Sequence, residues 1–371
     1  MIGILCANLD ANGGLEVVSK RLFNAFKKNY VDAKIYSCKH SDWENAKSFD
    51  TGNKLKKILI DQIVNCMRQD SIENLIIQLS DPFTCILANI ELYKRLNNAG
   101  IKVFTVLHNS PKSFLVHYPY LFDIVLVTWL KTIKAKVLLA PRAKKIIKKL
   151  SLFSSFVSIS KGCQKELENF FYVKSVVIPN YFDFFVMNMN LLLKKKHQFA
   201  TICRIDYYQK NFLLLLDAWN NVLEKKDWIL HIIGSGEKLF LKEYIKQKKI
   251  KNIEIDEALE NSEVVKFLEH NSVLLITSYN EGFPTIAVEA AACGNAIITS
   301  KYDGFSNELI EHEQNGFVCS FNTEEYASRI QEIINSDDLR MSFQKKSLDK
   351  TLELSRIDIV SLWKSLFENH M

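Results

Sequence analysis

Two glutamates, Glu281 and Glu289, stand eight residues apart in a segment that joins an apolar run to an Ala-rich stretch. Gly282 allows a ligand to approach the backbone closely, and Pro284 suits the first turn of a helix, where its missing N–H is not needed. The free N–H groups at such a helix start attract phosphate. Glu289, little more than a turn into the helix, could reach a ribose. The pattern predicts a nucleotide site; the alternative is two surface carboxylates beside a helix start.

Arg204 and Lys210 form a second group, between a predicted strand at 200–203 and a predicted helix at 211–224. A guanidinium makes forked contacts to phosphate oxygens, and an ammonium adds a compact positive charge. With a helix start they would stabilise a diphosphate leaving group without a metal ion. The sequence also lacks the Asp-x-Asp pair that holds a divalent cation on many sugar nucleotides. We therefore expect metal-independent chemistry and no cofactor.

Short apolar runs rich in β-branched residues alternate with amphipathic stretches in both halves of the chain, which is typical of parallel α/β sheets. A polar, irregular stretch at 186–196 separates the halves. We expect two Rossmann-like domains, 1–188 and 189–355, with parallel sheets that face each other across a cleft holding the active site. The predicted strands lie at 2–6, 34–37, 74–78, 102–107, 122–127, 156–160, 176–178, 200–203, 229–233, 253–255, 273–277, 296–299 and 316–319.

Short motifs along nearly the whole chain carry a resemblance to a known family. They are Asn12-Gly13-Gly14-Leu15-Glu16, Val106-Leu107-His108, Ser158-Ile159-Ser160, Ile178-Pro179-Asn180, residues 204–210, Gly234-Ser235-Gly236, the two glutamates at 281 and 289, and residues 304–308. With them the chain resembles the family 4 retaining glycosyltransferases of bacteria, the glycosyl transferases group 1, which have the GT-B fold and build surface polysaccharides. The glutamates with Arg204 and Lys210 upstream are the specific part. The resemblance implies that 356–371 is a helix crossing back to the N-terminal domain.

The resemblance also implies roles for the residues of the second half. Arg204 and Lys210 would bind the diphosphate of a nucleotide-sugar donor, and Glu289 would bond to the ribose hydroxyls. Glu281 and the backbone of residues 283–285 would hold the donor sugar. Transfer would retain the anomeric configuration, and the leaving phosphate would take the proton of the acceptor.

Four further residues are assigned by the same resemblance. Gly14 would lie near the diphosphate, His108 near the sugar, and Gly236 and Leu259 near the nucleobase. A lone histidine after a strand and a Gly-Gly turn are also common structural features. The candidate catalytic residues are Glu281 and His108, and the candidate donor-binding residues are Gly14, Arg204, Lys210, Gly236, Leu259, Phe283, Pro284, Thr285 and Glu289.

The formal charge of +6 is divided unevenly along the chain. Residues 1–188 hold 26 Lys and Arg against 15 Asp and Glu, whereas the remainder holds 22 against 27. The most basic segment could be a solvated helix on the outside of the domain, or it could bind an anionic membrane surface. We expect membrane binding, to which each basic residue near the surface would contribute roughly 1 kcal/mol. Nucleic acid is not expected, because no reading motif or aromatic platform is present. The segment, residues 131–149, carries Lys131, Lys134, Lys136, Arg142, Lys144, Lys145, Lys148 and Lys149.

The ends and the cysteines of the chain bear on its location. The first residues read as a strand without a basic leader, and the longest apolar runs are far shorter than the roughly 20 residues of a spanning helix. The eight cysteines include no C-x-x-C pair, which argues against zinc and disulfides. We expect a cytoplasmic protein, peripheral at the inner face of the cytoplasmic membrane.

These observations favour transfer of a hexose, from a UDP-linked donor more than a GDP- or ADP-linked one, to a lipid-linked or surface glycan in lipopolysaccharide, capsule or related polysaccharide synthesis. A sugar-nucleotide epimerase, a phosphorylase and a non-catalytic donor-binding partner are the alternatives. The acid and base groups of the first and the pyridoxal-bearing lysine of the second cannot be assigned. Gly234-Ser235-Gly236 lacks the third glycine of a dinucleotide fingerprint, which argues against a nicotinamide enzyme.

Overall fold

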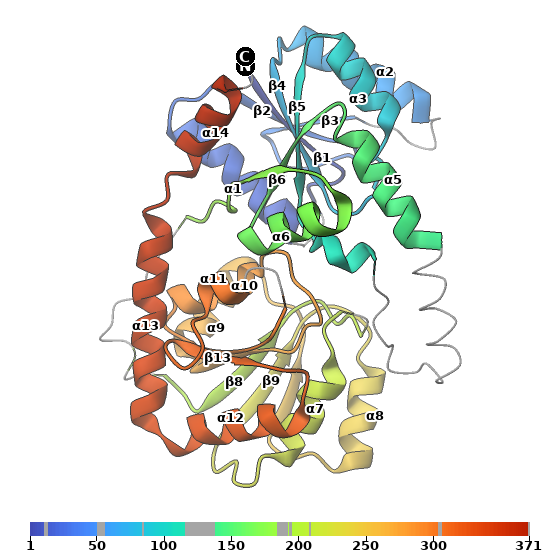
Figure 1. The fold of residues 1–371 in the computed structure, drawn as a ribbon. Helices are drawn as coiled ribbons and strands as arrows, with labels where there is room; N and C mark the ends of the chain where they lie inside the picture. Colours follow the sequence, from blue (N-terminus) through green and yellow to red (C-terminus); the bar gives the residue numbers. More distant parts are fainter. Residues whose placement is uncertain are drawn as a thin grey trace. The chain divides into compact units, whose positions relative to one another are not determined.

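A computed structural model describes the chain except for residues 11–13, 50–55, 84, 116–137, 184–191, 193, 194, 208, 303–305, 370 and 371. The described residues form two compact units (Figure 1). The N-terminal unit contains those of 1–183 and 358–371, and the C-terminal unit those of 184–357. The predictions that lie outside the described residues are the strand at 122–127, the turn at Asn12-Gly13, Gly304, most of the polar stretch 186–196, and Lys131, Lys134 and Lys136.

The sheet of the N-terminal unit has seven parallel strands in the order β3-β2-β1-β4-β5-β6-β7. The strands are β1 (Ile2–Cys6), β2 (Ala33–Ser37), β3 (Ala46–Ser48), β4 (Asn74–Leu79), β5 (Lys102–Leu107), β6 (Ser155–Ser158) and β7 (Ser175–Val177). The chain runs outward from β1 to β3 and resumes at β4 on the other side of β1, so the switch point of the sheet lies between β1 and β4. The edge strand β3 was not predicted, because its sequence is short and polar.

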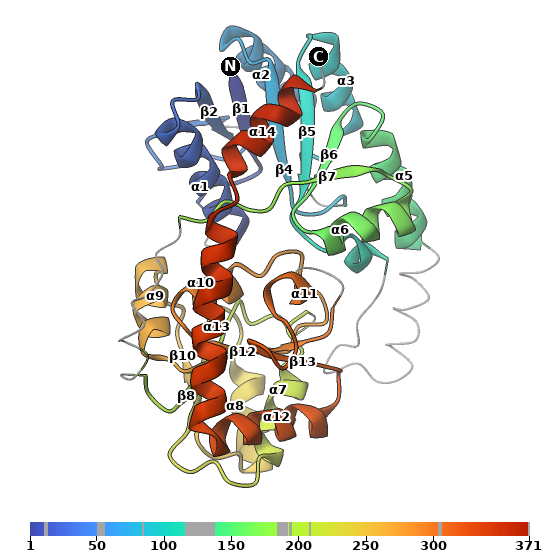
Figure 2. The ribbon, with the colours of Figure 1, turned by 60° about the vertical axis from the view of Figure 1, so that its left-hand side comes forward.

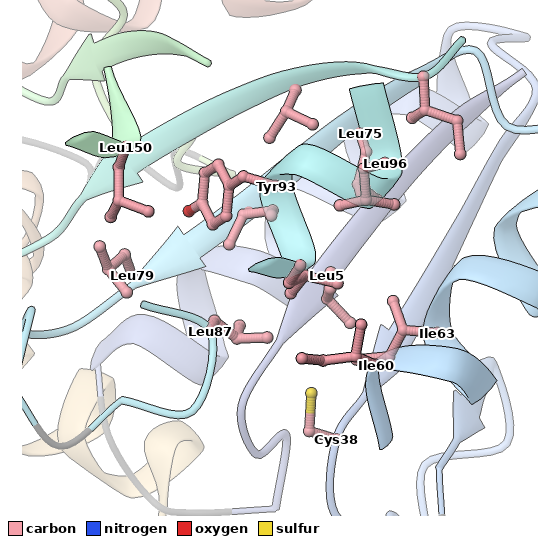
Figure 3. Close-up of a cluster of buried hydrophobic side chains, with 14 of the residues drawn as sticks. Leu5, Cys38, Ile60, Ile63, Leu75, Leu79, Leu87, Tyr93, Leu96 and Leu150 are labelled. Carbon is pink, nitrogen blue, oxygen red and sulfur yellow. The ribbon is translucent and has the colours of Figure 1, made fainter. Parts of the chain in front are cut away.

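Helices α2, α3 and α5 cover one face of this sheet, and their apolar side chains form a continuous core with the strands (Figure 3). Leu5 and Leu75 come from the central strands, Tyr93 from α3 and Leu150 from α5, and all four are fully buried. The helices of the unit are α1 (Gly14–Lys28), α2 (Lys56–Gln69), α3 (Ile90–Asn98), η1 (Pro111–Phe114), α5 (Ala140–Leu150), α6 (Lys161–Glu166), η3 (Leu167–Phe171) and α14 (Ile359–Glu368).

The last helix, α14, packs on the opposite face of the same sheet (Figure 2). Val103 of β5 belongs to the core under α2, α3 and α5, so the next residue, Phe104, points to the other side. The rings of Trp363 and Phe367 lie against Phe104, with centroids 6.3 and 5.0 Å from it. No described helix in the chain has the length and hydropathy needed to cross a membrane.

The sheet of the C-terminal unit has six parallel strands in the order β10-β9-β8-β11-β12-β13. The strands are β8 (Gln198–Ile202), β9 (Ile229–Ile233), β10 (Ile253–Asp256), β11 (Val273–Ile276), β12 (Ala296–Ser300) and β13 (Gly316–Cys319). The switch point here lies between β8 and β11, and ligands of such sheets bind at the carboxyl ends of the strands that flank it. The strands of this unit agree with the prediction within two residues.

Helices α7 and α12 cover one face of this sheet, where Trp219, Trp228 and Tyr326 fill the core. Helix α7 ends three residues before the predicted end, because Val222 has an extended backbone. The helices of the unit are α7 (Phe212–Asn221), α8 (Leu239–Lys248), α9 (Asn261–His270), α10 (Thr285–Ala292), α11 (Ser306–Leu309), α12 (Thr323–Asn335) and α13 (Asp337–Ser355).

Candidate functional site

The predicted diphosphate residues lie in the loop that joins β8 to α7, called here the Arg204 loop (residues 203–211, with 208 undescribed). The loop ends at Asn211, which caps the N-terminus of α7. Asn211 has a φ of 47°, and its side chain accepts a hydrogen bond from Leu214 N. Lys210 N donates to Asp206 O over 3.0 Å, which closes the loop into a turn. Arg204 is exposed, and its side chain contacts Asp206 Oδ2 in this turn at 3.3 Å.

Two glycines after β9 fix the position of the Arg204 loop. A Cβ atom on Gly234 would lie 1.8 Å from Cys203 O, and Gly236 has a φ of +132° with Ile205 O only 2.8 Å from its Cβ position. Because neither glycine has a side chain, the two segments approach closely enough for Ile205 N to donate to Ser235 O over 2.7 Å. Gly236 is therefore required by packing under the loop, a role that the sequence pattern did not reveal. Its predicted contact with a nucleobase stays a prediction.

The centre of the site is an ion pair between Lys210 and Glu281. Lys210 Nζ lies 2.5 Å from Glu281 Oε1, and the two side chains are 17% and 13% exposed. Burial alone would lower the pKa of Lys210, but the adjacent Glu281 carboxylate raises it above its ordinary value. The lysine therefore stays a cation at neutral pH. Sequence reasoning placed both residues in the site but did not predict that they pair.

Further hydrogen bonds hold the segments that carry this pair together. Gln209 Nε2 donates to Asn280 O at 2.9 Å and contacts Glu281 Oε2 at 3.4 Å. Thr277 Oγ1 donates to Lys210 O at 2.9 Å. Because β8 and β11 are neighbours, the segments that follow them meet at the switch point of the sheet. Gln209 and Thr277 were missed by the sequence analysis, since a single polar residue after a strand has no distinctive spacing.

Beyond Glu281 the chain turns directly into α10. Phe283 and Pro284 are buried, and Pro284 occupies the N-cap position, one residue before the helix, instead of its first turn as expected. Helix α10 starts at Thr285, and Glu289 is half-buried in its fifth position. The N–H groups of the first turn and the cations of the Arg204 loop thus belong to neighbouring segments, as a diphosphate site requires.

Leu259 follows β10 and is half-buried, in a segment that an ion pair ties to the glycine turn. Lys238 is 9% exposed and lies two residues after Gly236, and its Nζ is 2.6 Å from Glu257 Oε2. This pair joins the two segments that were predicted to face the nucleobase. Lys238 was not among the predicted site residues, whereas Glu257 begins the segment 257–259 that the resemblance places near the nucleobase.

The other two candidates, Gly14 and His108, belong to the N-terminal unit. Gly14 is exposed at the first position of α1. His108 directly follows β5, its Nε2 is hydrogen-bonded to Gln78 Oε1, and burial lowers its pKa to about 4. The residues after it are held by the buried carboxylate of Glu166, which accepts from Ser110 Oγ at 2.6 Å and from the backbone N–H of residue 112 at 2.9 Å.

One cluster among the described residues has the spacing of metal ligands, and its members come from β9 and β10. His231 of β9 and Glu254 and Asp256 of β10 place their ligand atoms within 4.8 Å of one another. His231 Nδ1 already contacts Asp256 Oδ2 at 3.0 Å, and its Nε2 contacts Gln198 at 3.1 Å. Both ring nitrogens are engaged within the protein, so the cluster is explained as a hydrogen-bonded group.

Comparison with known proteins agrees with this geometry. Residues 186–349 match the family model of glycosyl transferases group 1. A protein named as an uncharacterized glycosyltransferase of Haemophilus influenzae is 30% identical over 194 residues, which cover 49% of this chain and 54% of that protein. The amylovoran biosynthesis glycosyltransferase AmsD of Erwinia amylovora is 27% identical over 183 residues, covering 48% and 50%. The chain thus spans about half the length of the curated relatives it matches.

The fold is similar to that of the Anabaena protein HepE in its complex with UDP, with a TM-score of 0.71 at 15% identity, over 99% of this chain and 98% of that one. This likeness confirms the predicted fold class, GT-B with two Rossmann-like units. Residues 186–349 include the ion pair, the Arg204 loop and α10. All three features thus lie within the part of the chain that matches the glycosyl transferases group 1 family.

Proposed function

We propose that the chain is a retaining glycosyltransferase that moves a hexose from a UDP-sugar to a lipid-linked or surface glycan, in the synthesis of lipopolysaccharide, capsule or a related polysaccharide. The observation that carries the proposal is the largely buried Lys210–Glu281 pair beside the start of α10. An ammonium has three N–H donors. Among the described residues Lys210 Nζ is bonded only to Glu281, so it retains donors for a ligand.

The charges of the site suit a diphosphate that leaves the sugar. When the bond from the anomeric carbon to the phosphate oxygen breaks, negative charge grows on that oxygen, and Lys210 and Arg204 would neutralise it. Glu281 orients the ammonium and would accept hydrogen bonds from sugar hydroxyls. Glu289, half-buried on α10, would bind the ribose. Preorganised charges of this kind are often the largest contribution to a rate enhancement.

Retention would follow from attack on the same face from which the phosphate leaves. The acceptor hydroxyl oxygen forms the new bond to the anomeric carbon, the bond to the phosphate breaks, and the acceptor proton passes to the departing phosphate oxygen. No metal ion is needed in this scheme, because two cations and a helix start supply positive charge. The complex of HepE with UDP supports uridine as the base, since the two folds agree over nearly their whole length.

The acceptor side of the proposal rests on the basic helix α5. Its buried face, Ala143, Ile147 and Leu150, packs on the core. The opposite face exposes Arg142, Lys144, Lys145, Lys148 and Lys149, and exposed leucines lie beyond both ends of the helix, Leu138 at 60% and Leu152 at 72%. Basic residues beside exposed leucines fit an anionic membrane surface, where a lipid-linked acceptor would be found.

The donor proposal is tested by thermal stabilisation with UDP, GDP, ADP and their common sugars in EDTA. UDP and one UDP-sugar should raise the melting temperature by several degrees at 100 times Kd, since such binding adds about 2.7 kcal/mol. Lys210→Ala and Glu289→Ala should each weaken this stabilisation. Folded protein that none of these nucleotides stabilises would refute the donor site and favour a non-catalytic role.

The membrane proposal is tested by sedimentation with vesicles of phosphatidylglycerol and of phosphatidylcholine. The chain should bind the anionic vesicles and lose that binding when Lys144, Lys145, Lys148 and Lys149 are replaced by Gln. The matched control replaces four exposed lysines of the C-terminal unit, Lys242, Lys246, Lys248 and Lys249. Equal loss in both variants would show that total charge, and not α5, governs binding.

A further inference from the structure

Gln78 is an amide buried at the end of a central strand, where an apolar residue would be expected. It lies on β4, is 2% exposed, and comes one residue before the strand ends at Leu79. The backbone N–H of His108 donates to Leu79 O at 3.1 Å, which continues the pairing of β5 with β4 by one residue. The side chains of Gln78 and His108 meet there through Oε1 and Nε2.

The chemistry of the amide decides which ring nitrogen of His108 carries the proton. A carboxamide oxygen accepts hydrogen bonds and does not donate them, so its partner Nε2 must carry a hydrogen. In a neutral imidazole the other nitrogen, Nδ1, then has a free lone pair. Nδ1 has no hydrogen-bond partner among the described residues. Burial keeps the ring neutral, because it lowers the pKa of His108 to about 4.

Burial is what lowers the pKa of the His108 ring. The adjoining strands β1, β4 and β6 contain no charged residue. The segment after His108 is pinned in place, since Asn109 Nδ2 donates to Ser80 O at 2.9 Å and Glu166 binds Ser110. The charged residues in the adjoining strand β5, the loops, η1 and α6 are Lys102, Asp81, Lys112, Lys161, Lys165 and Glu166.

We propose that Gln78 is a positioning residue that fixes the Nε2–H tautomer of His108, so that Nδ1 accepts a hydrogen bond from a hydroxyl of the bound sugar. The inference rests on the proposed function, because it assigns the ligand atom to a saccharide. It also explains a neutral amide at this position. A carboxylate there would favour the imidazolium, in which both ring nitrogens donate and neither accepts.

The test compares Gln78→Glu and Gln78→Met with wild type. The signals of His108 in ¹⁵N NMR spectra, assigned with His108→Asn, give its tautomer and pKa directly, and sugar transfer gives kcat/KM between pH 6 and 9. Wild type should hold the Nε2–H form with a flat profile. Gln78→Met should mix the tautomers and lower kcat/KM about tenfold to hundredfold, by analogy with the loss when the hydrogen-bond partner of a metal-binding histidine is removed. Gln78→Glu should raise the His108 pKa, so that its activity recovers only at high pH.

A matched control separates positioning from loss of stability. Thr105→Val removes a buried hydroxyl of β5 that bonds to Tyr93 Oη, away from His108. It should destabilise the unit without changing the tautomer or the shape of the pH profile. If Gln78→Met leaves His108 in the Nε2–H form, or if all pH profiles superimpose, the inference is wrong even for an active enzyme. A wild-type protein that no nucleotide stabilises refutes the proposed function instead, and thermal shifts on the same samples distinguish the two outcomes.

Discussion

Each unit of the molecule contains a largely buried carboxylate that is bound to lysine, Asp70 in one and Glu281 in the other. The two differ in how many of the possible hydrogen bonds are made within the protein. Asp70 of the N-terminal unit lies just after α2, before β4, at the amino-terminal edge of its sheet. Glu281 follows β11, at the carboxyl edge. The Asp70 oxygens accept hydrogen bonds from four side chains: Lys34 Nζ at 2.9 Å, Tyr36 Oη at 2.8 Å, Lys47 Nζ at 3.0 Å and Cys66 Sγ at 3.5 Å.

The Lys210–Glu281 pair is less complete by comparison. Lys210 Nζ has one described partner, although an ammonium can donate three hydrogen bonds. Asp70 and its four partners, called here the Asp70 group, therefore use their hydrogen bonds on one another and stabilise the fold. Lys210 instead keeps unused donors at the edge where ligands of parallel sheets bind. Hydrogen-bond donors that the protein leaves unused, more than burial, therefore distinguish an ion pair in a ligand site from a structural one.

The largest expected effect is on the activity of Lys210→Met. Removal of a positive charge that stabilises the leaving diphosphate should lower kcat/KM by about 10²–10³. The free energy of unfolding should change much less, since Glu281 is left beside solvent and Gln209. Steady-state kinetics and urea unfolding on one preparation measure both quantities.

The matched control is Lys34→Met, which removes a lysine from the Asp70 group. Its kcat/KM should stay within about threefold of wild type, because Lys34 pairs with Asp70 at the amino-terminal edge of the N-terminal sheet. A similar loss of activity in both variants would mean that unfilled bonding capacity does not identify the ligand site.

Asp70→Asn should have the next largest effect, and on stability. The amide cannot accept as strongly from two ammonium groups, so we expect the free energy of unfolding to fall by about 2 kcal/mol. The exposed fractions of Lys34 and Lys47, 42% and 52%, keep this below the cost of a fully buried pair. Activity at temperatures well below unfolding should be unchanged. Lost activity in folded Asp70→Asn protein would assign this group to function.

The Asp70 group should also make the N-terminal unit sensitive to acid. Burial alone would raise the pKa of Asp70, but hydrogen bonds from Lys34, Lys47 and Tyr36 hold it below its usual range. Because the folded pKa lies below the unfolded value of about 3.9, the stabilisation is complete above about pH 5 and is lost as the pH falls. Urea unfolding from pH 6 to 3 should therefore show a steeper loss in wild type than in Asp70→Asn. A loss between pH 6.5 and 4 in both proteins would point to His108 instead, whose pKa burial lowers to about 4.

The sequence was informative about elements and less so about the contacts between them. β-Branched apolar runs predicted parallel strands well, because a strand covered on both faces needs no polar alternation. The Glu-x7-Glu spacing and the upstream cations predicted the residues at the carboxyl edge. The edge strand β3 is short and polar, and the predicted helix after Asn211 continued past Val222, where the backbone becomes extended.

The contacts that complete the candidate site join segments that are far apart in the sequence. The spacing of residues within one motif does not show which segments the fold brings together. Gly234 reads as part of an incomplete dinucleotide motif, yet its lack of a side chain is what admits Cys203 O. Gln78 stands in an apolar run without a recognisable partner, and only the pairing of β4 with β5 brings it to His108. The four partners of Asp70 are spread over 33 residues of chain, from Lys34 to Cys66.

The smallest expected effect concerns Arg204, the exposed cation of the site. Its side chain is 70% exposed and contacts Asp206 at 3.3 Å, so the fold does not depend on it. Arg204→Lys keeps the charge but loses the forked geometry, and we expect the KM for the donor to rise about tenfold, near 1.4 kcal/mol, with kcat changed less. The effect should shrink at 0.5 M salt, because exposed charges are screened. If Arg204→Lys instead matched Lys210→Met in lowering kcat, exposure and not unfilled bonding capacity would be the better sign of a catalytic cation.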